Sequence, residues 1–276
     1  MIFPAIVKST VREAFSRKIL LSLFILFSFV ILLIAALINL DAVQGIPKLL
    51  EAQPDFDYRS FIIKMELLMI SQPSFLIVMI LFIIMSSSFI PSLLQKGTVE
   101  LTLSKPVSRT EIILGKFSGG VIIVFIALTY LISLIWAVIS LKTGVWHFAF
   151  LYSILWYTLI FAVLYSLVIL TGIITKSTIM SLIINVLLFF PFTAILSAKD
   201  NISLFASNKV LAFILNFIYH ILPKPWDMRG LCSDAIDGSL NMSGGFFYVY
   251  QPVITSLIFM LVCLSLSVYY FSKKDY

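Results

Sequence analysis

The chain has 276 residues, of which 61% are hydrophobic and only 12% are charged, and its formal net charge is +6. Soluble domains carry about 25% charged residues, so a chain this apolar cannot cover its surface with polar groups in water, and its solvent is a lipid bilayer. The positive residues stand beside apolar runs, as they do at the flanks of membrane helices, which argues against a nucleic-acid partner.

The first predicted element is an amphipathic helix. Apolar residues recur there at the spacing of one helix face: Phe3, Ile6, Val7, Val11, Ala14 and Phe15. Lys8, Arg12 and Glu13 lie off that face. A short helix with this pattern lies flat in the membrane interface and leads the chain into the bilayer. The apolar run that follows has no small-residue cleavage site, so we expect it to be a retained anchor.

Six segments are apolar enough, and long enough, to cross a bilayer, which takes about 20 residues of helix. They are residues 19–40, 73–90, 118–141, 148–174, 177–198 and 252–271. The predicted fold class is therefore an all-α integral membrane protein with six transmembrane helices in one domain, residues 1–276.

Residues 91–117 form a charged island between the second and third spans. Ser108 and Glu111 have the spacing of a capping box, in which each side chain bonds the other residue's backbone amide. Pro106 disfavours a helix at Lys105. We therefore predict a break followed by a new helix, 109–116, that runs directly into the third span. Residues 97–104 fit either a short helix or a strand, because their periodicity does not decide between them.

Residues 199–251 are predicted to form a long external loop. Within it, residues 210–222 are apolar but too short to cross the bilayer, so a re-entrant or interfacial helix is expected, with a seventh crossing as the alternative. The segment 223–237 contains Trp226 and Arg229. It is interpreted either as an aromatic anchor at the interface or as a surface for an extracytoplasmic protein.

Lys and Arg counts give the orientation, because cytoplasmic loops are enriched in these residues. Those on the side predicted to be cytoplasmic are Lys8, Arg12, Arg17, Lys18, Lys96, Lys105, Arg109, Lys116, Lys176, Lys273 and Lys274. The loop 41–66 carries an acidic excess and is predicted to be external. Both termini are therefore predicted to be cytoplasmic, in a multi-pass protein of the plasma (inner) membrane.

The island also carries a family resemblance. Its motifs GTVEL (97–101), SKPVSR (104–109) and GKF (115–117) resemble the cytoplasmic segment of type-2 ABC exporter permeases. The nearest branch by resemblance is the NosY-like one, which serves copper-site maturation of nitrous oxide reductase. The six-span layout and the C-terminal residues 271–275 are similar to that family as well.

The resemblance implies a half-transporter that pairs with a second permease protomer, in a homodimer or heterodimer, and with two copies of a cytoplasmic ABC ATPase. The N-terminal helix would be the family's elbow helix, and the island would hold the coupling helix that docks on the ATPase. The residues implied in ATPase coupling are Gly97, Thr98, Glu100, Lys105, Pro106, Arg109, Glu111, Gly115 and Lys116.

ATP chemistry is expected in that partner rather than in this chain. Gly115 and Lys116 resemble the end of a phosphate-binding loop, but such a loop needs glycine five residues earlier and Ser or Thr after the lysine. Those positions hold Thr110 and Phe117. We therefore expect no enzyme activity and no bound cofactor here, with ATP and Mg²⁺ in the ATPase. The cysteines and histidines have no metal-site spacing, so no metal is expected.

Polar residues inside the predicted spans are the candidates for a substrate path. They are Asn185, Thr129, Tyr130 and Ser133. Such residues also bond neighbouring helices, which is the alternative interpretation of each. No acidic or basic residue falls mid-span, which argues against proton-driven transport, and no paired carboxylates or histidine cluster suggest an intramembrane enzyme.

The predicted function is therefore the permease subunit of an ATP-driven ABC exporter. The alternative is a membrane scaffold through which an ABC ATPase acts on an extracytoplasmic protein without moving a solute. The sequence does not identify the substrate.

Overall fold

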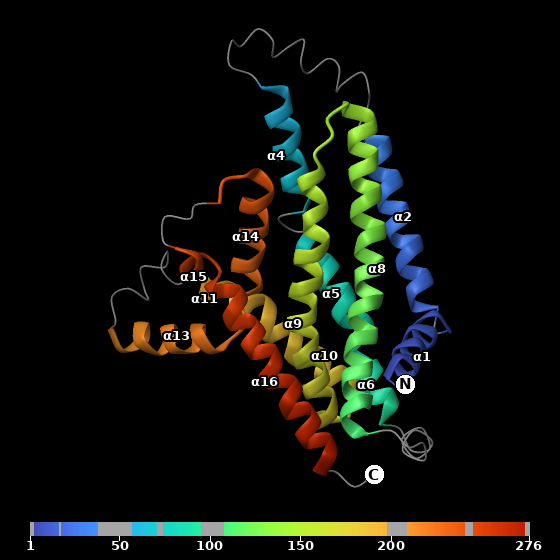
Figure 1. Ribbon diagram of the computed structural model, residues 1–276, viewed down its shortest axis with the longest axis vertical. Coiled ribbons are helices and arrows are strands. Elements are labelled where there is room, and N and C mark those ends of the chain that lie inside the picture. The colour runs from blue at the N-terminus through green and yellow to red at the C-terminus, as the bar shows by residue number, and fades with distance from the viewer. Residues whose placement is uncertain are drawn as a thin grey trace.

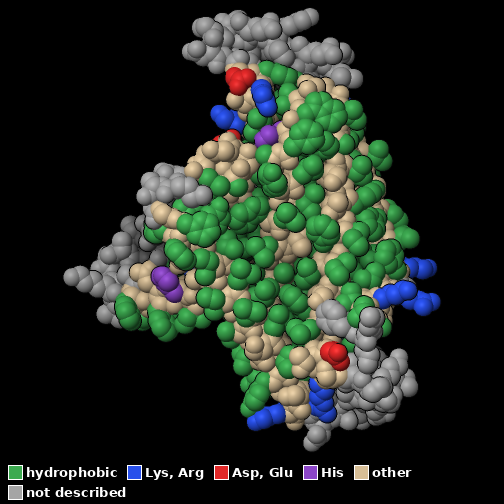
Figure 2. All heavy atoms as spheres, viewed as in Figure 1, with side chains coloured by type: hydrophobic (Ala, Val, Ile, Leu, Met, Phe, Trp, Pro, Cys, Tyr) green, Lys and Arg blue, Asp and Glu red, His purple; other side chains and the backbone are tan. Residues whose placement is uncertain are grey.

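A computed structural model of the chain describes residues 3–16, 18–37, 57–70, 74–94, 108–197, 209–240 and 245–273. Every regular element in these ranges is a helix, which confirms the predicted helical class for this part of the chain. A helix satisfies its own backbone hydrogen bonds, which an apolar solvent requires. Hydrophobic side chains cover the middle of the surface in Figure 2, with most charged ones toward its two ends.

The N-terminal half contains six helices in the described ranges: α1 (Phe3–Ser16), α2 (Ile19–Leu37), α4 (Tyr58–Ile70), α5 (Ser74–Ser87), α6 (Phe89–Leu93) and α8 (Arg109–Thr143). The chain turns sharply between α1 and α2 at Lys18, whose φ of 56° is left-handed. The helix α8 has 35 residues and extends about 52 Å. It ends at Gly144, which has φ 74° and bonds its amide to the Ser140 carbonyl, a glycine C-cap.

The C-terminal half begins with the 3₁₀ turn η1 (Phe148–Leu151) and α9 (Tyr152–Thr175). The remaining elements are α10 (Thr178–Leu187), the π-helical η2 (Leu188–Phe192), α11 (Thr193–Ser197), α13 (Lys209–Ile221), α14 (Pro225–Asp237), α15 (Phe246–Val249) and α16 (Gln251–Lys273). The π-helical turn contains Pro191, which cannot donate a backbone hydrogen bond. The sequence analysis did not predict this irregularity inside the predicted fifth span.

The helix α9 forms the centre of the bundle, in contact with α5, α8, α10, α14 and α16. Four helical segments are long and apolar enough to cross a membrane: Arg109–Thr143, Phe148–Thr175, Thr178–Ser197 and Gln251–Lys273. Two shorter apolar helices, Leu20–Ala36 and Ile77–Pro91, fall within or close to the first two predicted spans. The six-span layout therefore stays a prediction, while the apolar helical bundle is established for the described residues.

Two described helices lie where the sequence analysis expected loops. In α4, Asp57 accepts hydrogen bonds from the Arg59 amide and the Ser60 hydroxyl, as an N-cap does. In α14, Pro225 occupies the first turn, a favoured place for proline. Charged and polar residues lower the hydropathy of both helices below that of a transmembrane span; in α4 these include Lys64 and Glu66. Such residues do not prevent a helix from forming.

The helix α13 covers most of the predicted apolar segment 210–222. It lies across the direction of α9 and α16 (Figure 1), and Phe213 and Phe217 are exposed. Its placement as a re-entrant or interfacial helix stays a prediction.

Candidate functional site

The candidate site is the first part of α8, residues 109–120, which we call the α8 base. The predicted capping box is present at its start: the Glu111 amide donates to Ser108 Oγ at 3.2 Å, and the Ser108 amide donates to Glu111 Oε2 at 3.1 Å. The helix then continues without interruption into the predicted third span. Five of the residues implied in ATPase coupling lie outside the described residues: Gly97, Thr98, Glu100, Lys105 and Pro106.

Arg109 joins the α8 base to the end of α16. Its Nη1 donates to the Phe271 carbonyl at 2.9 Å and to the Ser272 carbonyl at 3.0 Å, and its guanidinium lies 6.0 Å from the centre of the Phe271 ring. A cation at a helix C-terminus satisfies terminal carbonyls and interacts favourably with the helix dipole. Arg109 therefore bonds a part of its own chain that lies 162 residues further along the sequence.

Two glycines of the α8 base form the surface on which α1 packs. A Cβ at Gly115 would lie 2.7 Å from Ile6 Cγ2, and one at Gly119 would lie 2.7 Å from Thr10 Cβ. Small residues four apart let two helices approach this closely. The predicted amphipathic helix is thus present, but Ile6 and Val11 of its apolar face pack on the protein core, while Phe15 is exposed.

Lys116 forms an ion pair with Glu13 of α1. The Lys116 Nζ lies 2.6 Å from Glu13 Oε2, and the two side chains are 8% and 28% exposed. Breaking a buried pair on one side leaves a charge without its partner, which is strongly destabilising. The pair therefore ties α1 to the α8 base.

Gly120 lies against Tyr165 of α9. A Cβ there would be 2.4 Å from Tyr165 Cε1. The Tyr165 ring is fully buried and stacks on Phe117 and Phe161 at centroid distances of 5.9 and 5.3 Å. The α8 base is thus the place where α1, α9 and α16 all meet α8, and in Figure 1 α1 and α16 lie on opposite sides of the lower end of α8.

The structure places Asn185, one of the four candidate substrate-path residues, in a helix contact. Asn185 of α10 is buried and donates to Thr171 Oγ1 at 2.9 Å and to the Ser181 carbonyl at 2.7 Å. Thr171 and Ser181 bond each other at 2.8 Å. This network joins α9 to α10, although Asn185 Oδ1 has no hydrogen-bond partner among the described residues.

The other three candidates are on α8. The Tyr130 hydroxyl bonds Ser28 Oγ of α2 at 2.7 Å, and Thr129 Oγ1 donates to the Phe125 carbonyl of its own helix. Ser133 is one turn further along and half-buried. The contacts of Tyr130 belong to the α2–α8 interface and those of Asn185 to the α9–α10 interface. A role of the four residues in a substrate path stays a prediction.

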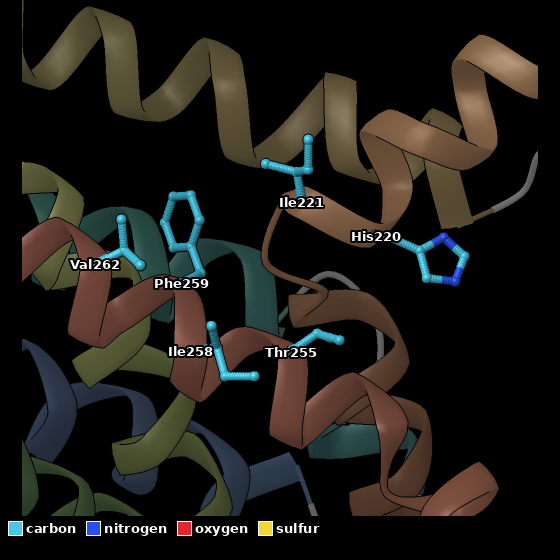
Figure 3. Close-up of a pocket in the computed structure, with 6 residues that line it drawn as sticks. All are labelled: His220, Ile221, Thr255, Ile258, Phe259 and Val262. Atoms are coloured by element: carbon cyan, nitrogen blue, oxygen red, sulfur yellow. The ribbon is translucent and has the colours of Figure 1, made fainter.

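A shallow apolar groove of about 280 Å³ lies between α13 and α16. Figure 3 shows its lining: His220, Ile221, Thr255, Ile258, Phe259 and Val262. None of the four candidate substrate-path residues is among these. His220 points away from the other five and interacts with the Asn216 carbonyl through Nδ1 at 2.7 Å.

A buried acid–histidine pair lies near the opposite end of α8, and the sequence analysis did not single it out. The Glu66 carboxyl of α4 is fully buried, and its Oε2 lies 2.9 Å from His147 Nδ1. Glu66 Oε1 has no hydrogen-bond partner among the described residues. Burial raises the pKa of Glu66 above its ordinary value, and the bond to His147 opposes that rise. The pair joins α4 to the turn between α8 and α9.

The segment 223–237 forms part of the bundle. Met228, Cys232 and Ile236 of α14 are buried, and Asp227 accepts hydrogen bonds from Ser197 and Tyr219. The guanidinium of Arg229 lies 5.5 Å from the Trp226 ring centre. The anchor and the partner interpretations of this segment both stay predictions.

A family model described as ABC-2 family transporter protein matches residues 5–276, which is almost the whole chain. No curated protein matches the chain.

Proposed function

The chain belongs to the ABC-2 family of transporter proteins, and from this premise we propose that it is the exporter permease of an ABC system. Membership makes it a multi-pass membrane component that associates with an ABC ATPase. The proposal adds the export direction, the pairing with a second protomer and with two ATPase copies, and the location of the ATPase contact in residues 91–117. It also adds the NosY-like branch, the inner membrane and cytoplasmic termini.

One observation carries the proposal: α8 is a single helix from Arg109 to Thr143. The island leads directly into this helix through the capping box at Ser108. A displacement applied to the island would therefore be transmitted along a stiff rod to the far end of the bundle. The same rod carries the contacts to α1, α9 and α16 at its base.

The proposed mechanism follows from this geometry. Closure of two ATPase subunits on ATP would displace the island of each protomer and with it the α8 base. The bundle would respond by alternating access or by lateral extrusion of the substrate between the protomers. Hydrolysis and the binding of ATP and Mg²⁺ would take place in the ATPase.

The scaffold function is the second candidate, and one observation favours it. Tyr130 and Asn185 bond residues of neighbouring helices, and the groove in Figure 3 is lined mainly by apolar side chains. ATP-dependent uptake into inside-out vesicles would distinguish an exporter. Hydrolysis that rises only when an extracytoplasmic protein is added would distinguish the scaffold.

Glu100→Lys is expected to release the ATPase, because a charge reversal within the docking segment opposes the contact that the family resemblance implies. The measurement is co-purification of the ATPase with the tagged chain from native membranes, quantified by mass spectrometry. We expect two ATPase copies for two permease protomers in the wild type. In the variant, most or all of the ATPase should be lost.

Glu51→Lys is the matched control, since it makes the same charge reversal in the loop predicted to be external. It should leave the ATPase bound. Recovery of the wild-type chain with no ATPase would contradict the proposal, and so would equal ATPase recovery with both variants.

A further inference from the structure

We propose that α1 is a fixed part of the moving lever, held on the α8 base by the Glu13–Lys116 ion pair, rather than an independent anchor in the membrane. Lys116 is then a positioning residue: it makes α1 follow the displacement of α8. This inference rests on the proposed function, because the displacement is supplied by the ATPase.

The two helices match each other residue by residue. Ile6 and Thr10 are one helical turn apart on α1, and Gly115 and Gly119 are one turn apart on α8. A Cβ added at Gly115 would lie 2.7 Å from Ile6 Cγ2, and one added at Gly119 would lie 2.7 Å from Thr10 Cβ. Thr10 is fully buried, and its hydroxyl donates to the Ile6 carbonyl of its own helix. The two helices are therefore close-packed at this contact, which resists a movement of α1 along α8 by less than one helical turn.

The ion pair fixes the register of that contact. Ile6 faces Gly115 and Thr10 faces Gly119, so α1 and α8 run parallel and Glu13 lies further along the interface than Lys116. The Lys116 side chain crosses this offset to reach Glu13 Oε2 at 2.6 Å. At a side-chain exposure of 8%, Lys116 gains little solvation from water. A shift of α1 along α8 would leave this ammonium without its carboxylate, which is costly in a low-dielectric environment.

The outer face of α1 is left to water or lipid headgroups. Lys8 and Arg12 are exposed on it. At its C-terminal end, α1 is connected to α2 through the sharp turn at Lys18, and α2 itself packs along α8. Ile6, Thr10 and Glu13 thus hold α1 on α8, and the end of α1 is connected to a helix that also packs on α8, which is what a rigid unit requires.

The test uses spin labels, and labelling is simple because Cys232 and Cys263 are both buried. One label per protomer is placed at Thr110→Cys, which is exposed at the start of α8, or at Lys8→Cys, which is exposed on α1. Distances between the two protomers are measured in nanodiscs for the complex with its ATPase, first without nucleotide and then trapped with MgATP and vanadate. The result expected for the wild type is that both distances change together.

In Lys116→Met, the distance between the Thr110 labels should still change with nucleotide. The distribution of distances between the Lys8 labels should broaden, and its mean should no longer change together with the Thr110 distance. Glu13→Gln should act in the same way. The coordinated change should return in Lys116→Arg and in the charge exchange Glu13→Lys with Lys116→Glu. Lys64→Met, which alters an exposed lysine of α4, should leave the coordinated change intact.

The inference is overturned if the Lys8 distance fails to follow the Thr110 distance in the wild type, or if Lys116→Met leaves the two still moving together. It is also overturned if Lys116→Arg and the charge exchange restore nothing. Failure of the proposed function gives a different result: no ATPase is recovered, or neither distance responds to nucleotide.

Discussion

Gly120→Val is expected to lower the stability of the bundle by about 3 kcal/mol, at the upper end of typical overpacking effects. The valine Cβ would lie 2.4 Å from Tyr165 Cε1, 2.8 Å from Cζ and 2.9 Å from the hydroxyl oxygen. Tyr165 cannot turn aside easily, because its ring is fully buried and stacks on both Phe117 and Phe161. Either α8 must move away from α9 or the aromatic stack must reorganise. The measurement is the thermal unfolding midpoint of the purified protein in detergent.

Gly230→Val is the matched control for this change. Gly230 is also a glycine inside a helix, and a Cβ added there would meet nothing within 4 Å. Both variants carry the same change in helix propensity and in the conformational freedom of the unfolded chain. The difference between them therefore reports the contact with Tyr165. Equal midpoints for the two variants would contradict a close α8–α9 approach at Gly120.

His147→Ala is expected to destabilise the protein by about 3 kcal/mol at pH 8, because the buried Glu66 carboxyl loses its hydrogen-bond partner. The loss should be smaller near pH 5. Burial raises the pKa of Glu66, and the bond to His147 opposes this rise. Without His147 the folded chain should hold the Glu66 proton to a still higher pH.

The sign of the pH effect follows from proton binding. A carboxyl whose pKa is raised in the folded chain binds more protons there than in the unfolded chain. Stability is therefore lost as the pH rises from the ordinary glutamate range through the folded pKa. Thermal midpoints measured between pH 5 and pH 8 should fall more steeply for His147→Ala than for the wild type, and adding Glu66→Gln to that variant should flatten the curve.

His220→Ala is the control, since the chain has two histidines and His220 is exposed. Its stability should follow the wild-type pH dependence. A His147→Ala effect that is the same at both pH values would argue against a buried carboxylate at Glu66.

Local signals in the sequence were sufficient for several elements. The capping residues Ser108 and Glu111 are only three positions apart and mark the start of α8. The long apolar runs predict α8, α9 and α16, because length and hydropathy can be measured on a single segment. The helices α4 and α14 were missed since their charged residues lowered the hydropathy. Their capping signals at Asp57 and Pro225 were present in the sequence and could have identified them.

Contacts between distant segments could not be predicted in the same way. Nothing in the local sequence around Arg109 indicates that its guanidinium bonds carbonyls at the end of α16, and nothing around Glu66 indicates His147. The family resemblance implied a role for Arg109, Gly115 and Lys116 in ATPase coupling. That role stays a prediction, and the contacts observed for these residues lie within the chain.

In the proposed function, a separate ATPase binds the end of the bundle where α8 begins. The most direct test is cross-linking from single cysteines at Thr110, exposed at the α8 base, and at Asp57, exposed at the start of α4 near the opposite end. We expect Thr110→Cys to cross-link to the ATPase in native membranes and Asp57→Cys not to do so. Cross-links from Asp57→Cys alone, or from neither position, would contradict it.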